Sequence, residues 1–201
     1  MAGSGTPRIG VLALQGDFRE HAIVLRGLGA DVVHVRRPEE LAAVDGLILP
    51  GGESSVQDKL SRTFGLAEPL KQAIASGLPV YGTCAGLIFL ADRITEGIAG
   101  QQTLGGLDVV VRRNAFGSQL DSFETDLDVP VLGGEPVHAV FIRAPVVDTL
   151  GPRATALASL ADGRVVAVEQ GNLLGTAFHP EVTGDIRFHA YFLDKVRAHA
   201  A

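Results

Sequence analysis

Short, almost uninterrupted hydrophobic runs alternate with amphipathic segments through the first half of the chain. A run that is apolar at nearly every position is typical of a strand buried on both faces of a parallel sheet, whereas apolar positions three or four apart indicate a helix. Strands and helices that alternate in this way predict a right-handed, doubly wound parallel sheet. The predicted strands are 8–14, 31–35, 45–49 and 79–81; the predicted helices are about 17–28, 66–76 and one starting at 85, with a short helical link over 38–43.

Residues that favour helix ends stand at the expected places. Asp17 is a predicted N-cap, and Gly29 and Gly77 are predicted to end their helices. In open α/β sheets, binding sites form outside the carboxyl ends of the strands. We therefore look for chemistry in the segments that follow the predicted strands.

The second half of the chain has a different pattern. Its strand-like runs are short and are separated by glycine, proline or aspartate turns, with hairpin signals at 161–164 and 171–172. No linker of flexible composition precedes them, so we expect antiparallel strands that extend the first sheet. The runs are 107–111, 137–142, 154–160, 164–169 and 173–178, followed by a helix over about 185–198.

These patterns predict one α/β domain with a flavodoxin-like, doubly wound, mostly parallel sheet and added antiparallel strands. The domain is expected over residues 8–201, and residues 1–7 (M-A-G-S-G-T-P) are expected to be a flexible tail. A length of 201 residues, 46% hydrophobic residues and 25 glycines suit one compact core with many tight turns.

Charge and cysteine content narrow the possible functions. The formal net charge is -6 and there is no run of Lys or Arg, which argues against nucleic-acid binding. A single cysteine excludes an intrachain disulfide framework and fits a reducing compartment. No apolar stretch is long enough to span a membrane, and the first residues lack the pattern of a signal peptide. The expectation is a soluble, cytoplasmic protein.

The only cysteine lies where a strand turns into a helix. In 82–86 (G-T-C-A-G), Gly82 permits a sharp turn after the apolar strand, and a buried helix starts after Cys84. A thiol at this turn sits at the positive end of the helix, which favours the thiolate, as in nucleophile elbows. Cys84 is therefore a candidate nucleophile. The alternative is a buried cysteine that acts as a small apolar residue.

A glycine pair follows the strand 45–49. Pro50-Gly51-Gly52-Glu53-Ser54 can turn backbone N–H groups toward a ligand, and a helix starting near Ser54 or Ser55 adds its own donors. With the N–H of Ala85, this loop is a candidate oxyanion hole beside Cys84. The alternative is an ordinary turn between a strand and a helix.

A base and a group that orients it occur together near the end of the last strand. Pro180 favours an extended conformation at His179, and in an extended segment His179 and Glu181 project to the same side. Such a pair can serve a thiol nucleophile, with the carboxylate setting the imidazole tautomer. A surface turn is the alternative. The other five histidines lack this setting and are expected to be surface or packing residues: His21, His34, His138, His189 and His199.

Metal and nucleotide chemistry are not indicated. The sequence has no C-x-x-C or H-E-x-x-H pattern, no P-loop and no G-x-G-x-x-G after a strand, so we expect neither a metal nor a cofactor.

The three motifs together resemble the triad-type (class I) glutamine amidotransferases. More narrowly, four further segments look like the glutaminase subunit family of pyridoxal 5′-phosphate synthase: A-L-Q-G-D at 13–17, R-N-A-F-G at 113–117, D-S-F-E at 121–124 and F-I-R-A-P at 141–145. The match runs from about residue 9 to the C-terminal helix.

The resemblance implies hydrolysis of L-glutamine to glutamate and ammonia, with transfer of the ammonia to a separate synthase subunit within a large hetero-oligomer. It implies Cys84 as nucleophile, His179 as acid and base, and Glu181 as the orienting group. The residues it implies for glutamine binding are Gly52, Glu53, Ser54, Arg113, Ile142 and Arg143. Ser118 departs from the pattern, because the family usually has an arginine there.

Two other functions remain open at this point. A cysteine peptidase or deglycase with the same elbow would cleave peptides without releasing glutamate from glutamine. A non-catalytic, flavodoxin-like regulatory module would carry an inert Cys84 that alkylates slowly.

Overall fold

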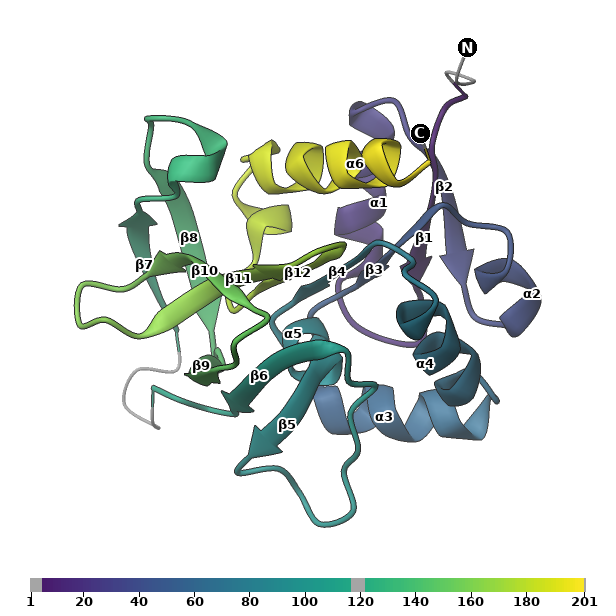
Figure 1. Cartoon of the computed structure of the whole chain (residues 1–201), viewed down its shortest axis with the longest axis horizontal. Helices are drawn as coiled ribbons and strands as arrows, with labels where there is room; N and C mark the ends of the chain where they lie inside the picture. Colours follow the sequence, from purple (N-terminus) through teal and green to yellow (C-terminus); the bar gives the residue numbers. More distant parts are fainter. Residues whose placement is uncertain (1–4, 117–121, 201) are drawn as a thin grey trace.

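A central sheet organises the protein, seen in a computed structural model that describes residues 5–116 and 122–200 (Figure 1). Within those residues, ten strands form the sheet in the order β2-β1-β3-β4-β12-β11-β9-β6-β5, with β10 paired to β11. The expected doubly wound α/β architecture with added antiparallel strands is confirmed.

The first four strands and their crossovers match the hydrophobic pattern. All neighbours in this half are parallel. The elements are β1 (Arg8–Leu12), α1 (Phe18–Gly27), β2 (Asp31–Val35), α2 (Pro38–Leu41), β3 (Gly46–Leu49), α3 (Ser54–Thr63), α4 (Ala67–Ala75) and β4 (Val80–Thr83). Gly29 and Gly77 have φ of 83° and 94°, so both follow their helices in the left-handed conformation as predicted.

The second half differs from the prediction in two respects. Strand β12 (Leu173–Thr176) is parallel to β4, not antiparallel, and lies directly beside it. Strands β7 (Ser122–Leu127) and β8 (Val137–Ile142) form a separate two-stranded antiparallel sheet. The predicted hairpins are present, between β10 (Thr155–Ser159) and β11 (Val165–Gln170), and between β11 and β12.

Three strands were not predicted: β5 (Ala91–Thr95), β7 and β9 (Val146–Leu150). Polar residues interrupt each of them, and β5 follows the short helix α5 (Ala85–Leu90) without a turn. In β5 and β7 most positions are exposed or half-buried. Strand β5 pairs in parallel with β6 (Leu107–Arg112), so tertiary pairing holds a segment whose own pattern is weak.

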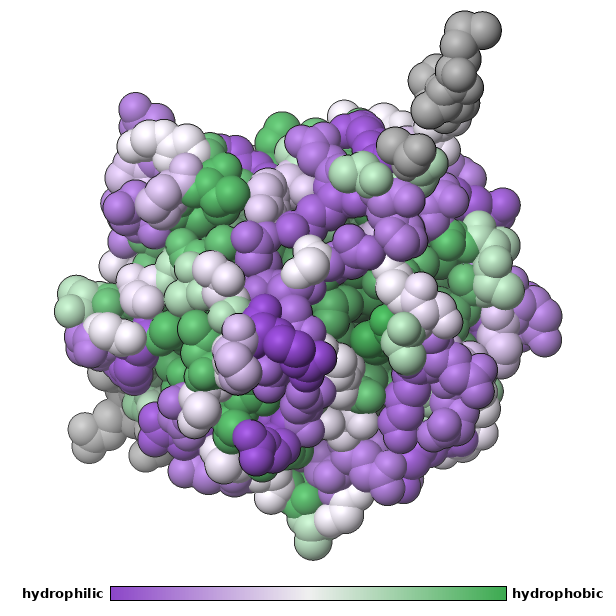
Figure 2. Space-filling model, in the orientation of Figure 1, coloured by the Kyte–Doolittle hydropathy of each residue, from purple (hydrophilic) through white to green (hydrophobic). Residues whose placement is uncertain are grey.

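Helices cover both faces of the sheet. In Figure 1, α1 and α6 (Arg187–His199) lie on one side of the parallel strands, and α3 and α4 lie on the other. One continuous hydrophobic core joins both halves of the chain. Hydrophilic side chains cover most of the face shown in Figure 2, and hydrophobic ones show in smaller patches among them. No helix of the described residues is both long and apolar enough to cross a membrane.

The structure describes only part of the predicted flexible tail. Residues 1–4 lie outside the described residues, and residues 5–7 have no regular secondary structure. Pro7 nevertheless joins the fold, because its carbonyl accepts a 3.0 Å hydrogen bond from the Asp31 N–H.

Backbone segments approach one another closely where β4 turns into α5. A Cβ at Gly86 would lie 1.9 Å from the Leu49 carbonyl oxygen, and a Cβ at Gly82 would lie 2.5 Å from the Gly86 oxygen. Leu49 and Gly175 stand opposite Gly82 on the two neighbouring strands. Glycine is required here because no side chain fits between the strand and the helix.

Replacement of Gly86 tests this packing. Gly86→Ala should lower the free energy of unfolding by about 3 kcal/mol, the upper end of the range for overpacking, since the new methyl group meets backbone. Gly27→Ala is the matched control. A Cβ at Gly27 meets nothing within 4 Å, and alanine in a helix should add about 0.5–1 kcal/mol. Urea unfolding of both variants is the measurement, and equal stabilities would contradict the argument.

Candidate active site

Cys84 sits at a sharp turn directly between β4 and α5. Its φ is 48° and its ψ is -104°, a rare conformation for a residue with a side chain. The backbone fixes it from both sides: the Cys84 N–H donates to the Thr176 oxygen at 2.8 Å, and the Ile88 N–H donates to the Cys84 oxygen at 3.2 Å. This is the predicted elbow. Because α5 has only six residues, however, the helix supplies less electrostatic support for a thiolate than expected.

His179 and Glu181 are in contact. The His179 Nδ1 lies 2.7 Å from Oε1 of Glu181, whose side chain is fully buried. The contact was predicted, but the reason given for it was wrong. Glu181 belongs to the 3-10 helix η2 (Pro180–Val182), and His179 occupies the N-cap position of that helix. The pair therefore does not lie in an extended segment.

Asp17 is a second carboxylate near the same nitrogen. Its Oδ2 lies 3.4 Å from His179 Nδ1. Asp17 is the N-cap residue of α1, as predicted, but its side chain caps no N–H of the helix. The contact that this side chain makes with His179 was not predicted. Its only signal was a polar residue after a buried strand, at the edge where sites form.

These contacts set the charges of the group. Burial by itself lowers the pKa of His179, but hydrogen bonding to Asp17, Cys84 and Glu181 outweighs it, and the pKa rises well above 6.5. Hydrogen bonding to His179 lowers the pKa of Asp17, whereas burial raises that of Glu181.

The same three residues are the one group with metal-like spacing in the described part of the chain. One possible ligand atom each from Asp17, His179 and Glu181 lies within 4.8 Å of the others. Hydrogen bonding between imidazole and carboxylate already accounts for their arrangement, so the group needs no ion to hold it together.

A pocket of about 370 Å³, partly open to solvent, lies beside Cys84. Its lining includes Cys84 and all six residues predicted to bind substrate. The complete lining is Gly52, Glu53, Ser54, Cys84, Ile88, Arg113, Asn114, Ile142 and Arg143. Ile88 and Asn114 were not predicted. His179 and Glu181 lie outside this lining.

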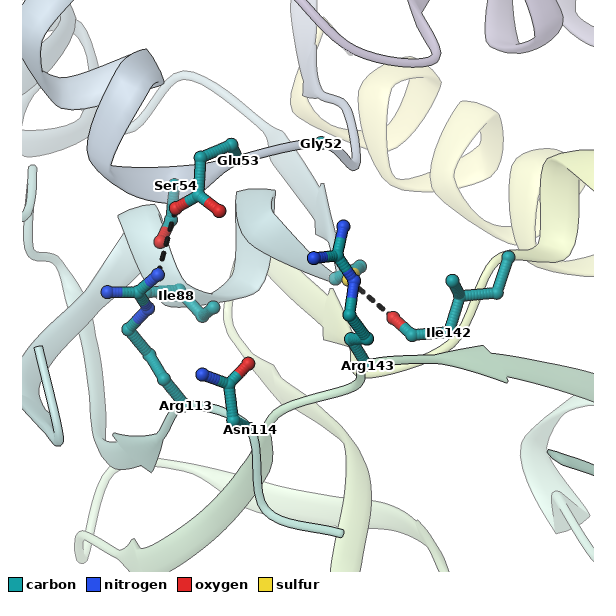
Figure 3. A pocket seen from close by; sticks show the side chains of 9 residues that line it. Gly52, Glu53, Ser54, Ile88, Arg113, Asn114, Ile142 and Arg143 are labelled. Carbon is teal, nitrogen blue, oxygen red and sulfur yellow. Dashed lines mark hydrogen bonds and ion pairs between the residues drawn. The ribbon is translucent and has the colours of Figure 1, made fainter. Parts of the chain in front are cut away.

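An ion pair spans one side of the pocket. Figure 3 shows Glu53 and Arg113 pointing toward each other, with Arg143 and Ile142 on the opposite side. Nη2 of Arg113 lies 2.8 Å from Oε1 of Glu53, and Nη1 donates to Gln101 Oε1 at 2.9 Å. Arg113 is only 9% exposed, so it is not an ordinary surface arginine.

The glycine loop after β3 is held by Gln15. Its amide donates to the Glu53 oxygen and accepts from the Glu53 N–H, both at 3.2 Å. A Cβ at Gly51 would lie 2.5 Å from Cε1 of His179, so the loop backbone packs directly against the imidazole. Gln15 belongs to the segment 13–17 that carries the family resemblance, but sequence reasoning gave it no role.

Two further histidines lie behind this group. His21 and His189 are both fully buried, with His21 Nδ1 and His189 Nε2 2.8 Å apart. Nε2 of His21 lies 3.6 Å from Oε2 of Glu181. The expected packing role is confirmed for both histidines, but the contact of His21 with Glu181 was not predicted; it arises because the fold brings α1 against η2. Ser118 lies outside the described residues.

A family model matches most of the chain. The model of the SNO glutamine amidotransferase family matches residues 11–198. The segment that it leaves out at the start includes the predicted tail.

Individual proteins match with high identity over nearly their whole length. The chain is 74% identical over 193 residues to the pyridoxal 5′-phosphate synthase subunit PdxT of Leifsonia xyli subsp. xyli, covering 96% of this chain and 98% of that protein. It is 70% identical over 190 residues to the protein of the same name from Clavibacter sepedonicus, covering 94% and 91%. A crystal structure of a glutamine amidotransferase superposes with a TM-score of 0.88 at 47% identity, covering 94% and 98%.

Stability toward acid tests the environment of His189. Burial lowers the pKa of His189 from 6.5 to about 4. Between these values the unfolded chain binds a proton that the folded protein does not, so stability falls as the pH decreases through this window. The loss is at most about 1.4 kcal/mol per pH unit for one histidine, about 3 kcal/mol in all.

His189→Gln should make this decline shallower. Urea unfolding at several pH values between 4.5 and 6.5 measures it, and His199→Gln, at an exposed position of the same helix, is the matched control. A decline as steep as that of the unchanged protein would contradict a neutral, buried His189.

Proposed function

Because the chain belongs to the SNO glutamine amidotransferase family, we propose that it hydrolyses L-glutamine to L-glutamate and ammonia and delivers the ammonia to a pyridoxal 5′-phosphate synthase subunit. One observation supports this most strongly: Cys84 lines the same pocket as the Glu53–Arg113 ion pair. A nucleophile and two groups of opposite charge thus face one small space, as an amino-acid substrate requires.

The pocket suits the two ends of glutamine. The Arg113 guanidinium is the donor for the α-carboxylate, and Glu53 is the acceptor for the α-ammonium group. Each is engaged by the other in the free protein, so neither charge lies unpaired before substrate arrives. Gly52, Ser54, Ile142 and Arg143 complete the walls around the side chain. The side-chain amide then reaches Cys84.

The reaction follows from the roles of Cys84, His179 and Glu181. The Cys84 thiolate attacks the amide carbon, and the resulting oxyanion takes N–H donors from the loop around Gly52 and from Ala85. Protonated His179 gives its proton to the departing nitrogen, and ammonia leaves a thioester. Neutral His179 then takes a proton from water, which attacks the thioester, and glutamate leaves as the thiolate–imidazolium pair is restored.

Glu181 keeps the imidazole oriented through both steps. Its hydrogen bond to Nδ1 directs Nε2 toward the thiol and balances the positive charge of the imidazolium. Asp17 adds a second negative group on the solvent side, since its side chain is 41% exposed while that of Glu181 is buried. Together they stabilise the charged form that donates a proton to the leaving group.

Transfer to a partner explains the separate subunit. Free ammonia largely becomes ammonium in water at neutral pH, so direct passage into the synthase subunit keeps it nucleophilic. We propose that the isolated chain is a poor glutaminase and that docking within a large hetero-oligomer orders its oxyanion loop. A single, buried free thiol is typical of proteins in a reducing compartment, so we propose that the chain acts in the cytoplasm.

Replacement of the nucleophile tests the proposed reaction. Glutamate release from L-glutamine should rise when a pyridoxal 5′-phosphate synthase subunit is added, and Cys84→Ala should reduce the stimulated rate by at least about 10³-fold. Cys84→Ala should still co-elute with the synthase subunit on a sizing column, which controls for loss of docking. Equal rates with and without the partner would contradict the coupling, and a fully active variant would exclude Cys84 as the nucleophile.

Two variants of Arg113 test its proposed role in substrate binding, one that removes the charge and one that keeps the charge but not the planar guanidinium group. Arg113→Met should lower kcat/KM for glutamine about 10- to 100-fold, mainly through KM, because a hydrogen bond to a charged group is lost. Arg113→Lys keeps the charge but not the planar fork and should recover little of the loss. Arg197→Lys, at an exposed position of α6, is the control. Unchanged KM values in both Arg113 variants would contradict the assignment.

A further inference from the structure

A chain of buried polar groups continues inward from Glu181. His21 stands on α1, Thr83 ends β4 and His189 stands on α6, so three separate elements meet behind the carboxylate. His21 Nε2 lies 3.1 Å from Thr83 Oγ1 and 3.6 Å from Glu181 Oε2, and its Nδ1 lies 2.8 Å from His189 Nε2. None of these side chains takes part in the reaction proposed above.

Two buried polar atoms of this group have no hydrogen-bond partner. Oε1 of Glu181 accepts from His179, but Oε2 is buried with no hydrogen bond of ordinary length. Nδ1 of His189 is also buried without a partner. A carboxylate oxygen in such a place needs a donor, because an unsatisfied buried charge is costly. Nε2 of His21 lies 3.6 Å from this oxygen.

Of the two neutral tautomers of His21, one places an N–H beside that oxygen. If His21 carries its proton on Nε2, this N–H points at Thr83 Oγ1 and Glu181 Oε2, and Nδ1 accepts from the Nε2–H of His189. The remaining orphan is then a lone pair on His189 Nδ1. The opposite arrangement places a lone pair of His21 against Glu181 Oε2 and leaves an N–H of His189 unpaired, which is less favourable on both counts.

We propose that His21 is a positioning residue: its Nε2–H holds Oε2 of Glu181, and His189 selects the tautomer of His21 that makes this possible. The inference rests on the proposed function of Glu181 as the group that orients His179. With the N–H of His21 3.6 Å from Oε2, the carboxylate is favoured in the orientation that keeps Oε1 on His179 Nδ1. Without His21, the carboxylate is free to rotate in its buried site and more readily takes up a proton.

The surroundings keep both histidines neutral. Burial is the main cause that lowers the pKa of each, and Tyr81 packs edge-on against the His189 ring at 5.9 Å. The titratable groups that face Glu181 are His179, Asp17, His21 and Tyr81; those that face His189 are His21, Tyr81 and Asp185. A neutral His21 can orient the Glu181 carboxylate through its N–H. Because it carries no positive charge, it leaves the negative charge of Glu181 to interact with protonated His179.

Two replacements of His21 separate positioning from packing. Glutamine places a side-chain N–H donor near the position of Nε2, whereas phenylalanine fills the space with no donor. In partner-stimulated glutamate release, His21→Phe should lower kcat about 10- to 100-fold with little change in KM, and His21→Gln should restore it to within a few-fold. His34→Gln, a histidine on β2, is the control.

The pH profile is the second readout. In His21→Phe the acid limb of kcat/KM should move to higher pH, since Glu181 then takes up a proton more easily. In His21→Gln it should stay in place. If His21→Phe does not fold, as judged by its unfolding transition, His189→Phe is used, because it removes the tautomer-selecting donor and should move the same limb in the same direction.

The outcomes distinguish this inference from the proposed function. Full activity in His21→Phe, or equal losses in the phenylalanine and glutamine variants with an unmoved acid limb, would overturn the positioning role while the Cys84→Ala variant remains inactive. Activity that survives in Cys84→Ala would instead show that the proposed reaction is wrong, whatever the result at His21.

Discussion

Three adjacent parallel strands impose the constraint on which the site depends. Strands β3, β4 and β12 end at the same edge of the sheet, and their continuations carry the glycine loop, Cys84 and His179 respectively. Backbone contact at Gly86 and the Cys84 N–H bond to Thr176 leave the elbow little freedom. The relative positions of Cys84 and His179 are thus set by sheet geometry and not by flexible side chains, which is what preorganisation requires.

Charge is distributed around His179 in two unlike environments. Glu181 is buried and held from behind, while Asp17 faces solvent, and burial and hydrogen bonding move their pKa values in opposite directions. On the pocket side, Glu53 and Arg113 pair with each other. Negative groups therefore surround the imidazole, and the pocket itself carries a pair of opposite charges. The two halves meet at Cys84, the residue that both require.

Periodicity and turn residues predicted the parallel half of the fold, because buried strands and amphipathic crossovers leave a strong local pattern. They failed where tertiary pairing decides, as in β5, whose polar residues are held by β6, and in β12, whose direction depends on insertion beside β4. Motifs brought Cys84, the Gly52 loop and His179 together correctly. Asp17 and His21 were missed because nothing local distinguishes a capping aspartate or a helical histidine from one that meets η2, about 160 residues away along the chain.

The position of β12 also bears on how the protein is made. This strand lies between β4 and β11, yet it is the last strand of the chain to leave the ribosome. Until it inserts, the two parts of the sheet have no shared ladder, and the chain must close contacts of long sequence separation, which is a slow step in folding. His179 and Glu181 follow directly after this strand. Cys84 is therefore synthesised long before His179 and Glu181. A nascent chain cannot assemble the candidate active site until its final segment is in place.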